Sequence, residues 1–239
     1  MRKVTPLLAV MALAFGLHDV QAEEIRVFGQ NMQNYYWNYD KTSRTSSNSV
    51  DVSNYSSDAG RAVKTRRIVN TLTGVNADIY AFCEVEACSI ILEQLADSLT
   101  LYSPYRYAAV SDGISYTFND GNDNHLKSGF IYRTDKVRPV GSNTAGSTST
   151  YYRDVMRIQA FEALSSGERF ILSMNHFKSG DTESDATNRA TRATQLVSTL
   201  NTLTTDPDIL PLRYLTFYAN ADFKTGKGNY KEPYIHDFM

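Results

Sequence analysis

Apolar residues gather in short runs along this chain, and turn-forming or polar residues bound most of these runs. Short apolar runs without a helical period are typical of strands that are buried on both faces. They predict strands at 25–30, 78–83, 105–110, 129–133, 137–140, 155–164, 169–174 and 212–218. Apolar residues at helical spacing predict three helices, over 60–73, about 90–99 and 186–203.

The connections between these runs indicate how the strands are joined. Residues 165–168 (Ser-Ser-Gly-Glu) predict a β-hairpin between the two runs that flank them. Residues 134–136 predict a second strand pair, 129–133 with 137–140, whereas residues 32–57 lack a period and predict a long surface loop. The order strand, helix, strand, helix, hairpins, helix, strand predicts an α/β fold. We expect a four-layer sandwich of two mixed β-sheets flanked by helices.

Two of the predicted strands end in titratable side chains. Glu84 follows the run 78–83, and His176 follows the run 169–174. Asn31 stands in the same way at the end of the first strand. Because functional groups in layered α/β folds gather at strand ends, these positions predict one shared site.

Each candidate also has a purely structural interpretation, which its position alone leaves open. Glu84 is either a ligand for a hard cation or an ordinary carboxylate at a strand end. His176 either contacts a phosphate and transfers a proton or is structural, and Asn175 either positions a phosphate or is a turn residue. Arg157, inside the run 155–164, either makes a bidentate phosphate contact or faces solvent.

The N-terminus has the pattern of a secretory signal. Basic residues at 2–3, an apolar core at 7–17 and small residues at 20–22 predict a signal peptide over 1–22, followed by one domain over 23–239. The apolar core is too short to span a membrane comfortably, so we expect export to a periplasmic or extracellular location; the alternative is an uncleaved N-terminal anchor. Removal of residues 1–22 changes the formal net charge from −2 to −3. The chain therefore lacks the basic footprint of a simple nucleic-acid binder.

Three common motifs, for a serine nucleophile, a zinc site and a phosphate-binding loop, are absent from the sequence. It contains no Gly-x-Ser-x-Gly, no His-Glu-x-x-His and no Gly-x-x-x-x-Gly-Lys-Ser/Thr. The two cysteines, Cys83 and Cys88, are either bridged or small buried thiols, and no histidine cluster accompanies them. This inventory favours metal-assisted hydrolysis over a serine or cysteine nucleophile.

Four ordered segments together resemble the endonuclease/exonuclease/phosphatase superfamily, which includes deoxyribonuclease-like enzymes. The segments are 30–34, 78–86, 128–133 and 175–179. The resemblance implies that Glu84 binds the metal, that Asn31 lies near it and that His176 contacts the scissile phosphate. It places Arg157 in the strand that precedes this histidine.

The C-terminal motifs of the superfamily are altered here. Where the superfamily has Gly-Asp-x-Asn, this chain has Ala221, Asp222 and Lys224, so the resemblance assigns only Asp222, as the residue that positions the attacking water. The final Ser-Asp-His motif is missing. We therefore expect a shortened chain, incomplete at its C-terminus, that lacks the last strands of the fold.

These observations predict an exported Mg²⁺-dependent phosphodiester hydrolase of the nuclease kind, with Mn²⁺ or Ca²⁺ as alternative ions. We expect a monomer that acts on nucleic acid or another phosphodiester. A second hypothesis is an inactive binding protein that keeps the fold, which Lys224 and the missing motif favour. A third keeps the chemistry but changes the substrate to a phospholipid or an inositol phosphate.

Overall fold

A computed structural model describes eight parts of the chain. The described residues are 24–35, 58–86, 88–110, 126–145, 156–177, 180, 182–204 and 213–218. The predicted signal peptide and Asp222 lie outside these ranges, so both remain predictions.

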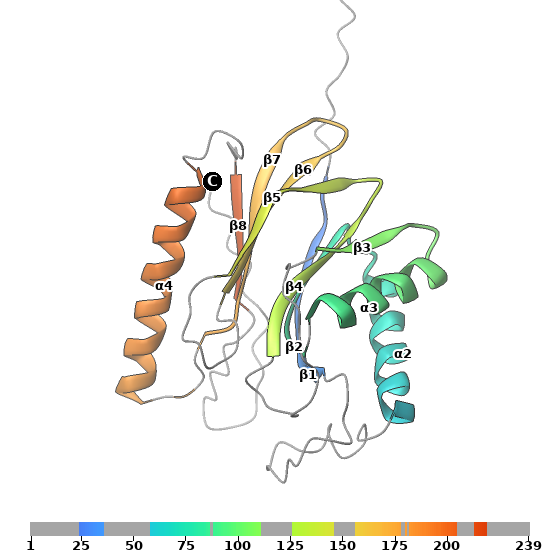
Figure 1. The fold of residues 1–239 in the computed structure, drawn as a ribbon, viewed down its shortest axis with the longest axis horizontal. Helices are drawn as coiled ribbons and strands as arrows, with labels where there is room; N and C mark the ends of the chain where they lie inside the picture. The colour runs from blue at the N-terminus through green and yellow to red at the C-terminus, as the bar shows by residue number, and fades with distance from the viewer. Residues whose placement is uncertain are drawn as a thin grey trace, which may run out of the picture.

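Eight strands form two four-stranded mixed sheets (Figure 1). The first sheet has the order β1-β2-β4-β3, with β1 Val27–Tyr35, β2 Ile79–Glu86, β4 Leu126–Arg133 and β3 Tyr107–Ala109. The second has the order β5-β6-β7-β8, with β5 Val137–Ala145, β6 Met156–Ala163, β7 Arg169–Asn175 and β8 Arg213–Tyr218. Each sheet contains one parallel pair, β1 with β2 and β7 with β8, and its other pairs are antiparallel.

Three helices complete the four layers. The helices α2 (Asp58–Val75) and α3 (Cys88–Tyr102) cover the outer face of the first sheet, and α4 (Glu183–Thr204) covers the outer face of the second (Figure 1). The predicted sandwich of two mixed sheets between helices is therefore confirmed. In the part of the chain that the structure describes, no helix is both long and apolar enough to cross a membrane.

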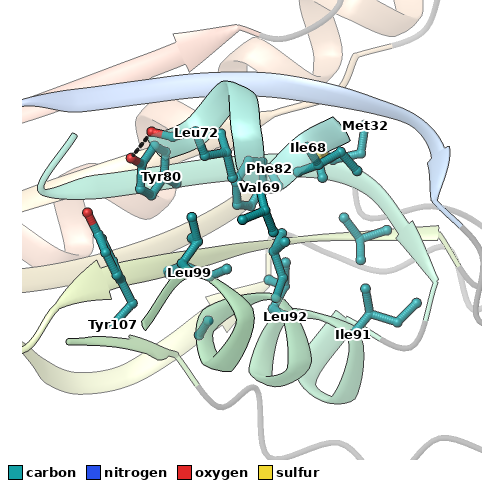
Figure 2. Close-up of a cluster of buried hydrophobic side chains, with 14 of the residues drawn as sticks. Met32, Ile68, Val69, Leu72, Tyr80, Phe82, Ile91, Leu92, Leu99 and Tyr107 are labelled. Atoms are coloured by element: carbon teal, nitrogen blue, oxygen red, sulfur yellow. Dashed lines mark hydrogen bonds between the residues drawn. The ribbon is translucent and has the colours of Figure 1, made fainter. Parts of the chain in front are cut away.

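The core consists of three apolar layers, one at each contact between these elements. The helix-facing layer of the first sheet contains Tyr80, Phe82 and Leu92 (Figure 2). The inter-sheet layer contains apolar residues of both sheets, among them Phe130 and Phe161, whose ring centroids lie 5.8 Å apart in an edge-to-face arrangement. The third layer lies between α4 and the second sheet. Both sheets are thus buried on both faces, which explains why their strands appear in the sequence as continuous apolar runs.

One predicted strand pair is wrong. Residues 129–133 and 137–140 do form strands, but β4 belongs to the first sheet and β5 to the second. Both edges of β4 are occupied, one by β2 and one by β3, so β5 cannot pair with it. The turn at 134–136 therefore carries the chain from one sheet to the other. The hairpin around 165–168 is confirmed as β6 and β7.

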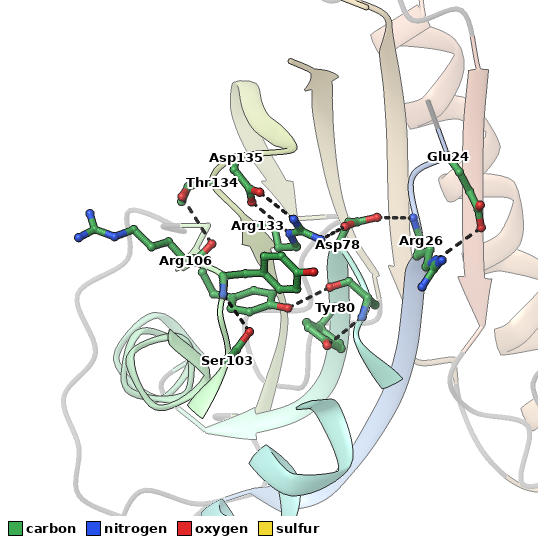
Figure 3. A network of polar contacts seen from close by, with 12 residues as sticks. Glu24, Arg26, Asp78, Tyr80, Ser103, Arg106, Arg133, Thr134 and Asp135 are labelled. Carbon is green, nitrogen blue, oxygen red and sulfur yellow. Dashed lines mark hydrogen bonds and ion pairs between the residues drawn. The ribbon is translucent and has the colours of Figure 1, made fainter. Parts of the chain in front are cut away.

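A polar clasp holds the first sheet together at the end where β2 begins (Figure 3). Asp78 accepts hydrogen bonds from the guanidinium of Arg133 at 2.9 Å and from the backbone N–H of Arg26 at 2.9 Å. Arg133 also donates to both carboxylate oxygens of Asp135, and its guanidinium lies 3.5 Å from the centre of the Tyr105 ring. These contacts tie together the starts of β1 and β2 and the end of β4.

A second ionic group crosses the second sheet. Glu162 of β6 accepts hydrogen bonds from Arg138 of β5 and Arg169 of β7, each at 2.9 Å from the arginine Nε, and the three residues are in register. The hydrogen bond from Arg169, and then the one from Arg138, lowers the pKa of Glu162. The carboxylate therefore favours the folded protein near neutral pH.

Candidate functional site

Glu84 and His176 meet between the two sheets. The Nε2 atom of His176 lies 3.1 Å from Oε1 of Glu84, and their side chains are 5% and 13% exposed. Glu84 comes from β2 of the first sheet, and His176 is the residue that follows β7 of the second. The prediction that the two strand ends share a location is therefore met by a direct contact, at the end of β2 opposite the Asp78 clasp.

A β-bulge directs Glu84 into the space between the sheets. Phe82 of β2 pairs with Gly129 of β4 and Val85 pairs with Lys127, so β2 has one residue more than β4 between the two pairs. Glu84 has a φ of 59°, in the left-handed region. As a result Val85, and not Glu84, follows Tyr80 and Phe82 into the helix-facing layer.

The energetic balance explains why β2 adopts this bulge. The left-handed conformation of a non-glycine residue costs about 1–3 kcal/mol. Without the bulge, strict alternation would place the Glu84 carboxylate in the apolar layer beneath the helices, where an ion costs several kcal/mol even after relaxation. The bulge costs less free energy than this burial, and it also allows Glu84 to contact His176.

Alternation along β7 sets the direction of His176 and of Asn175. Leu172 and Met174 lie in the inter-sheet layer, and His176 continues their side of the strand. Asn175 lies on the other side: it is fully buried, and its Oδ1 accepts a hydrogen bond from the Ser173 hydroxyl at 3.0 Å. The structure thus brings His176 to Glu84 and turns the Asn175 amide toward the opposite face of β7.

Asn31 stands beside the bulge on the neighbouring strand. It pairs in register with Cys83, the residue before Glu84. In β1 it lies on the same side as Val27, which packs against the inter-sheet layer. Asn31 and Glu84 therefore come from adjacent parallel strands at the same end, as the strand pattern predicts.

Arg157 is buried on the inter-sheet face of β6. It pairs with Met174, and His176 is two residues further along, so the two side chains are diagonal neighbours on one face. Arg157 is 1% exposed, which excludes the solvent-facing interpretation of this residue. A buried guanidinium requires hydrogen-bonding or ionic partners. Arg157 therefore places a positive charge in the inter-sheet space near His176.

The side chains beside the bulge fit the ligand requirements of Mg²⁺. This ion takes one or two carboxylates and fills its other positions with waters and substrate phosphate oxygens. The Glu84 carboxylate and the Asn31 amide, on adjacent strands, fit that limited requirement. Within the described ranges no group of three or more His, Cys, Asp or Glu side chains is placed to hold a metal ion. Asp222 lies outside those ranges.

The bulge at Glu84 is the feature that the sequence did not predict. Because β2 is buried on both faces, every position from 79 to 83 is apolar. The sequence therefore shows no alternation of polar and apolar residues that would mark the bulge. The only signal is Val85, an apolar residue between two glutamates. It marks the position that returns to the core.

Neither the comparison with protein-family models nor that with curated proteins finds a match. Among solved structures, the chain is similar to the human Nocturnin catalytic domain with bound sulfate (14% identity, TM-score 0.47, 81% of this chain and 62% of that one). It is also similar to an endonuclease/exonuclease/phosphatase family protein of Bacteroides thetaiotaomicron, with 16% identity and a TM-score of 0.49 over 81% of this chain and 62% of that one. A third similar structure is a mannosyl-6-phosphatase of Bacteroides thetaiotaomicron VPI-5482, with 15% identity and a TM-score of 0.49 over 82% of this chain and 64% of that one.

The superfamily that the motifs resemble is thus represented among the solved structures to which the chain is similar. The chain spans slightly less than two thirds of the length of these three structures. At such identities the likeness concerns the fold and not the chemistry.

Proposed function

We propose that this protein is a metal-dependent phosphodiester hydrolase that acts on nucleic acid. The observation that carries the proposal is the contact between Glu84 and His176 at 3.1 Å, made by two strand ends from different sheets. The backbone of Glu84 has a left-handed conformation, and its carboxylate contacts a histidine. This combination supports a functional role, because strained backbone conformations cluster at functional sites.

In this proposal Glu84 and Asn31 hold Mg²⁺, with Mn²⁺ or Ca²⁺ as alternatives. When bound, the ion would supply charge neutralisation to the phosphate and a Lewis acid for its oxygens. Hydrolysis of a phosphodiester by water requires such neutralisation and positioning more than covalent chemistry. The protein residues then act by orienting the phosphate.

His176 and Arg157 would provide the contacts to the phosphate. The Nε2 atom that contacts Glu84 is the atom that would donate a hydrogen bond to a phosphate oxygen. The buried guanidinium of Arg157, diagonal to His176, adds positive charge on the same face. Asp222 is proposed, by resemblance alone, to position the attacking water.

A second candidate function is a binding protein without turnover. Lys224 favours it, because a lysine stands where the superfamily has the Asn that helps to position the nucleophile. Such a protein would bind a phosphate-containing ligand and leave it intact.

The decisive experiment measures cleavage of supercoiled plasmid DNA and of RNA by the purified chain with and without Mg²⁺, and Mg²⁺ binding by calorimetry. We expect Glu84→Gln to abolish both cleavage and Mg²⁺ binding. The matched control is Glu93→Gln, which changes an exposed carboxylate of α3 and should behave like the parent. Equal cleavage by Glu84→Gln and the parent would refute the metal assignment. Binding of DNA or RNA without cleavage would establish the second candidate, and cleavage restricted to phospholipid or inositol phosphate would change the substrate class.

We also propose that the protein is exported after removal of residues 1–22. The pattern of basic, apolar and small residues at the N-terminus supports this. N-terminal sequencing of the protein recovered from a secreting host should begin at Glu23. An N-terminus at Met1 in the cytosolic fraction alone would contradict it.

A further inference from the structure

The two candidate metal ligands flank a gap in the pairing of β1 with β2. Asn31 and Cys83 are the last pair before the gap, and pairing resumes at Tyr35 and Val85. Three residues of β1 and one residue of β2, Glu84, lie between these pairs. The Tyr35–Val85 pair therefore closes the segment in which Glu84 adopts its left-handed conformation.

Tyr35 fastens this closing pair to α2. Its side chain is 3% exposed in the helix-facing layer, and its hydroxyl is hydrogen bonded to the hydroxyl of Thr65. The ammonium of Lys64 lies 5.9 Å from the centre of the Tyr35 ring, within the range of a cation–π interaction. Two consecutive residues of one helix thus hold the end of β1.

The anchor matters because of the position of β1 in the first sheet. Among the described strands it pairs with β2 alone, so it is an edge strand of the first sheet. Edge-strand ends fray readily when no packing or hydrogen bond from another element holds them. If the Tyr35–Val85 pair opens, Glu84 loses the flanking pair that keeps it in the left-handed region.

We propose that Tyr35 is a positioning residue for the metal site, and that it acts through the β2 bulge to hold the Glu84 carboxylate near Asn31 and His176. This inference rests on the proposed function for the identity of the ligand. Its structural part, the control of the bulge by the Tyr35–Thr65 hydrogen bond, concerns this chain alone.

The test compares Tyr35→Phe with Tyr80→Phe. Tyr80 lies in the same apolar layer, and its hydroxyl also bonds to α2, by donating to the Leu72 carbonyl at 2.7 Å, but it stands near the start of β2. Both substitutions remove one buried hydroxyl, so a general loss of stability affects both. Only Tyr35→Phe removes the anchor at the bulge.

Hydrogen exchange of the backbone amides of residues 83–86 is the first readout. We expect Tyr35→Phe to raise their exchange rate about three- to tenfold, the factor that loss of one hydrogen bond gives. The Mg²⁺ dissociation constant should rise by a similar factor. Thr65→Val should reproduce both changes, and the double variant should add nothing to either single one.

Equal exchange at 83–86 in Tyr35→Phe and Tyr80→Phe would overturn the inference, as would additive effects of the Tyr35 and Thr65 substitutions. Failure of the proposed function gives a different result, since the parent would then show neither Mg²⁺ binding nor cleavage. Faster exchange together with an unchanged Mg²⁺ dissociation constant in a Mg²⁺-binding parent would also overturn it. In that case the anchor would hold the strand but not the site.

Discussion

Replacement of Arg133 by methionine leaves Asp78 buried without its ion-pair partner. The side chains of these two residues are 9% and 6% exposed, and 2.9 Å separates Nη1 from Oδ1. Methionine keeps much of the apolar stem of arginine but removes every donor. The Asp78 carboxylate would retain only the backbone N–H of Arg26 among the partners that the clasp provides (Figure 3).

The expected cost is about 3–5 kcal/mol, which is typical when one partner of a buried ion pair is removed. Asp78→Asn should cost less, about 1–3 kcal/mol. Its amide oxygen can still accept one of the two hydrogen bonds that the carboxylate receives on separate oxygens, and Arg133 keeps both contacts to Asp135. The assay is urea unfolding of the purified variants followed by circular dichroism. In thermal unfolding, the loss for Arg133→Met corresponds to a Tm lower by roughly 6–20 °C.

The acid dependence supplies an independent check. The hydrogen bond from Arg133 lowers the pKa of Asp135, so Asp135 stabilises the fold above pH ~4 and loses this contribution as the pH falls through its lowered value. Arg133→Met has lost that contribution at every pH, and its difference from the parent should therefore narrow below pH ~4. A loss under about 1 kcal/mol at pH 7, or a larger loss in Asp78→Asn than in Arg133→Met, would refute the reasoning.

Three further changes test other parts of the fold. Glu162→Gln should lower the Tm at pH 7, and this effect should shrink as the pH falls below about 4, because the pKa of Glu162 is lowered in the folded protein and its stabilising contribution is lost as acid protonates it. An effect on the Tm that stays constant down to pH ~2 would contradict the ion-pair account. Leu92→Ala, in the helix-facing layer, should cost about 2–5 kcal/mol in urea unfolding, against less than about 0.5 for the exposed Leu101→Ala. Gly180→Ala should cost about 1–3 kcal/mol, because Gly180 has a φ of 117° and its new Cβ would lie 2.2 Å from Oδ2 of Asp185. Asp185 lies in the first turn of α4 and accepts a hydrogen bond from the Thr182 hydroxyl, so the clash would disturb the start of the helix; an unchanged Tm would show that this turn relaxes freely.

The fold could largely be predicted because both sheets are buried on both faces. Burial on both faces produces the continuous apolar runs from which every strand was identified, and the helix-spaced residues between them mark the covering layers. The apolar runs do not specify which strands pair with each other. Residues 134–136 fit either a hairpin turn or a connection between the two sheets. Pairing of β4 with β2 on one edge and with β3 on the other excludes the hairpin. Strand pairing is a property of distant residues, not of the turn.

The extent of β1 shows a related limit. Residues 32–35 continue the strand into a segment where the sequence predicts a loop. Pairing with β2 and the burial of Met32 and Tyr35 stabilise this extension. Both depend on residues that are distant in the sequence, such as Val85 of β2 and Thr65 of α2. β-propensity depends strongly on context, so the local sequence does not predict that residues 32–35 form a strand or that Tyr35 anchors it.

The site itself was predicted as a pair of strand ends, and the structure adds the mechanism that joins them. Two strands in different sheets can bring their ends to the same edge and still point their last side chains apart. Here His176 keeps the phase of its strand, whereas Glu84 reaches it only because β2 inserts one residue and changes phase. Deleting the bulge, and not only the carboxylate, would therefore separate the pair. The geometry of the candidate site thus depends on the pleat of β2 as much as on the identity of residue 84.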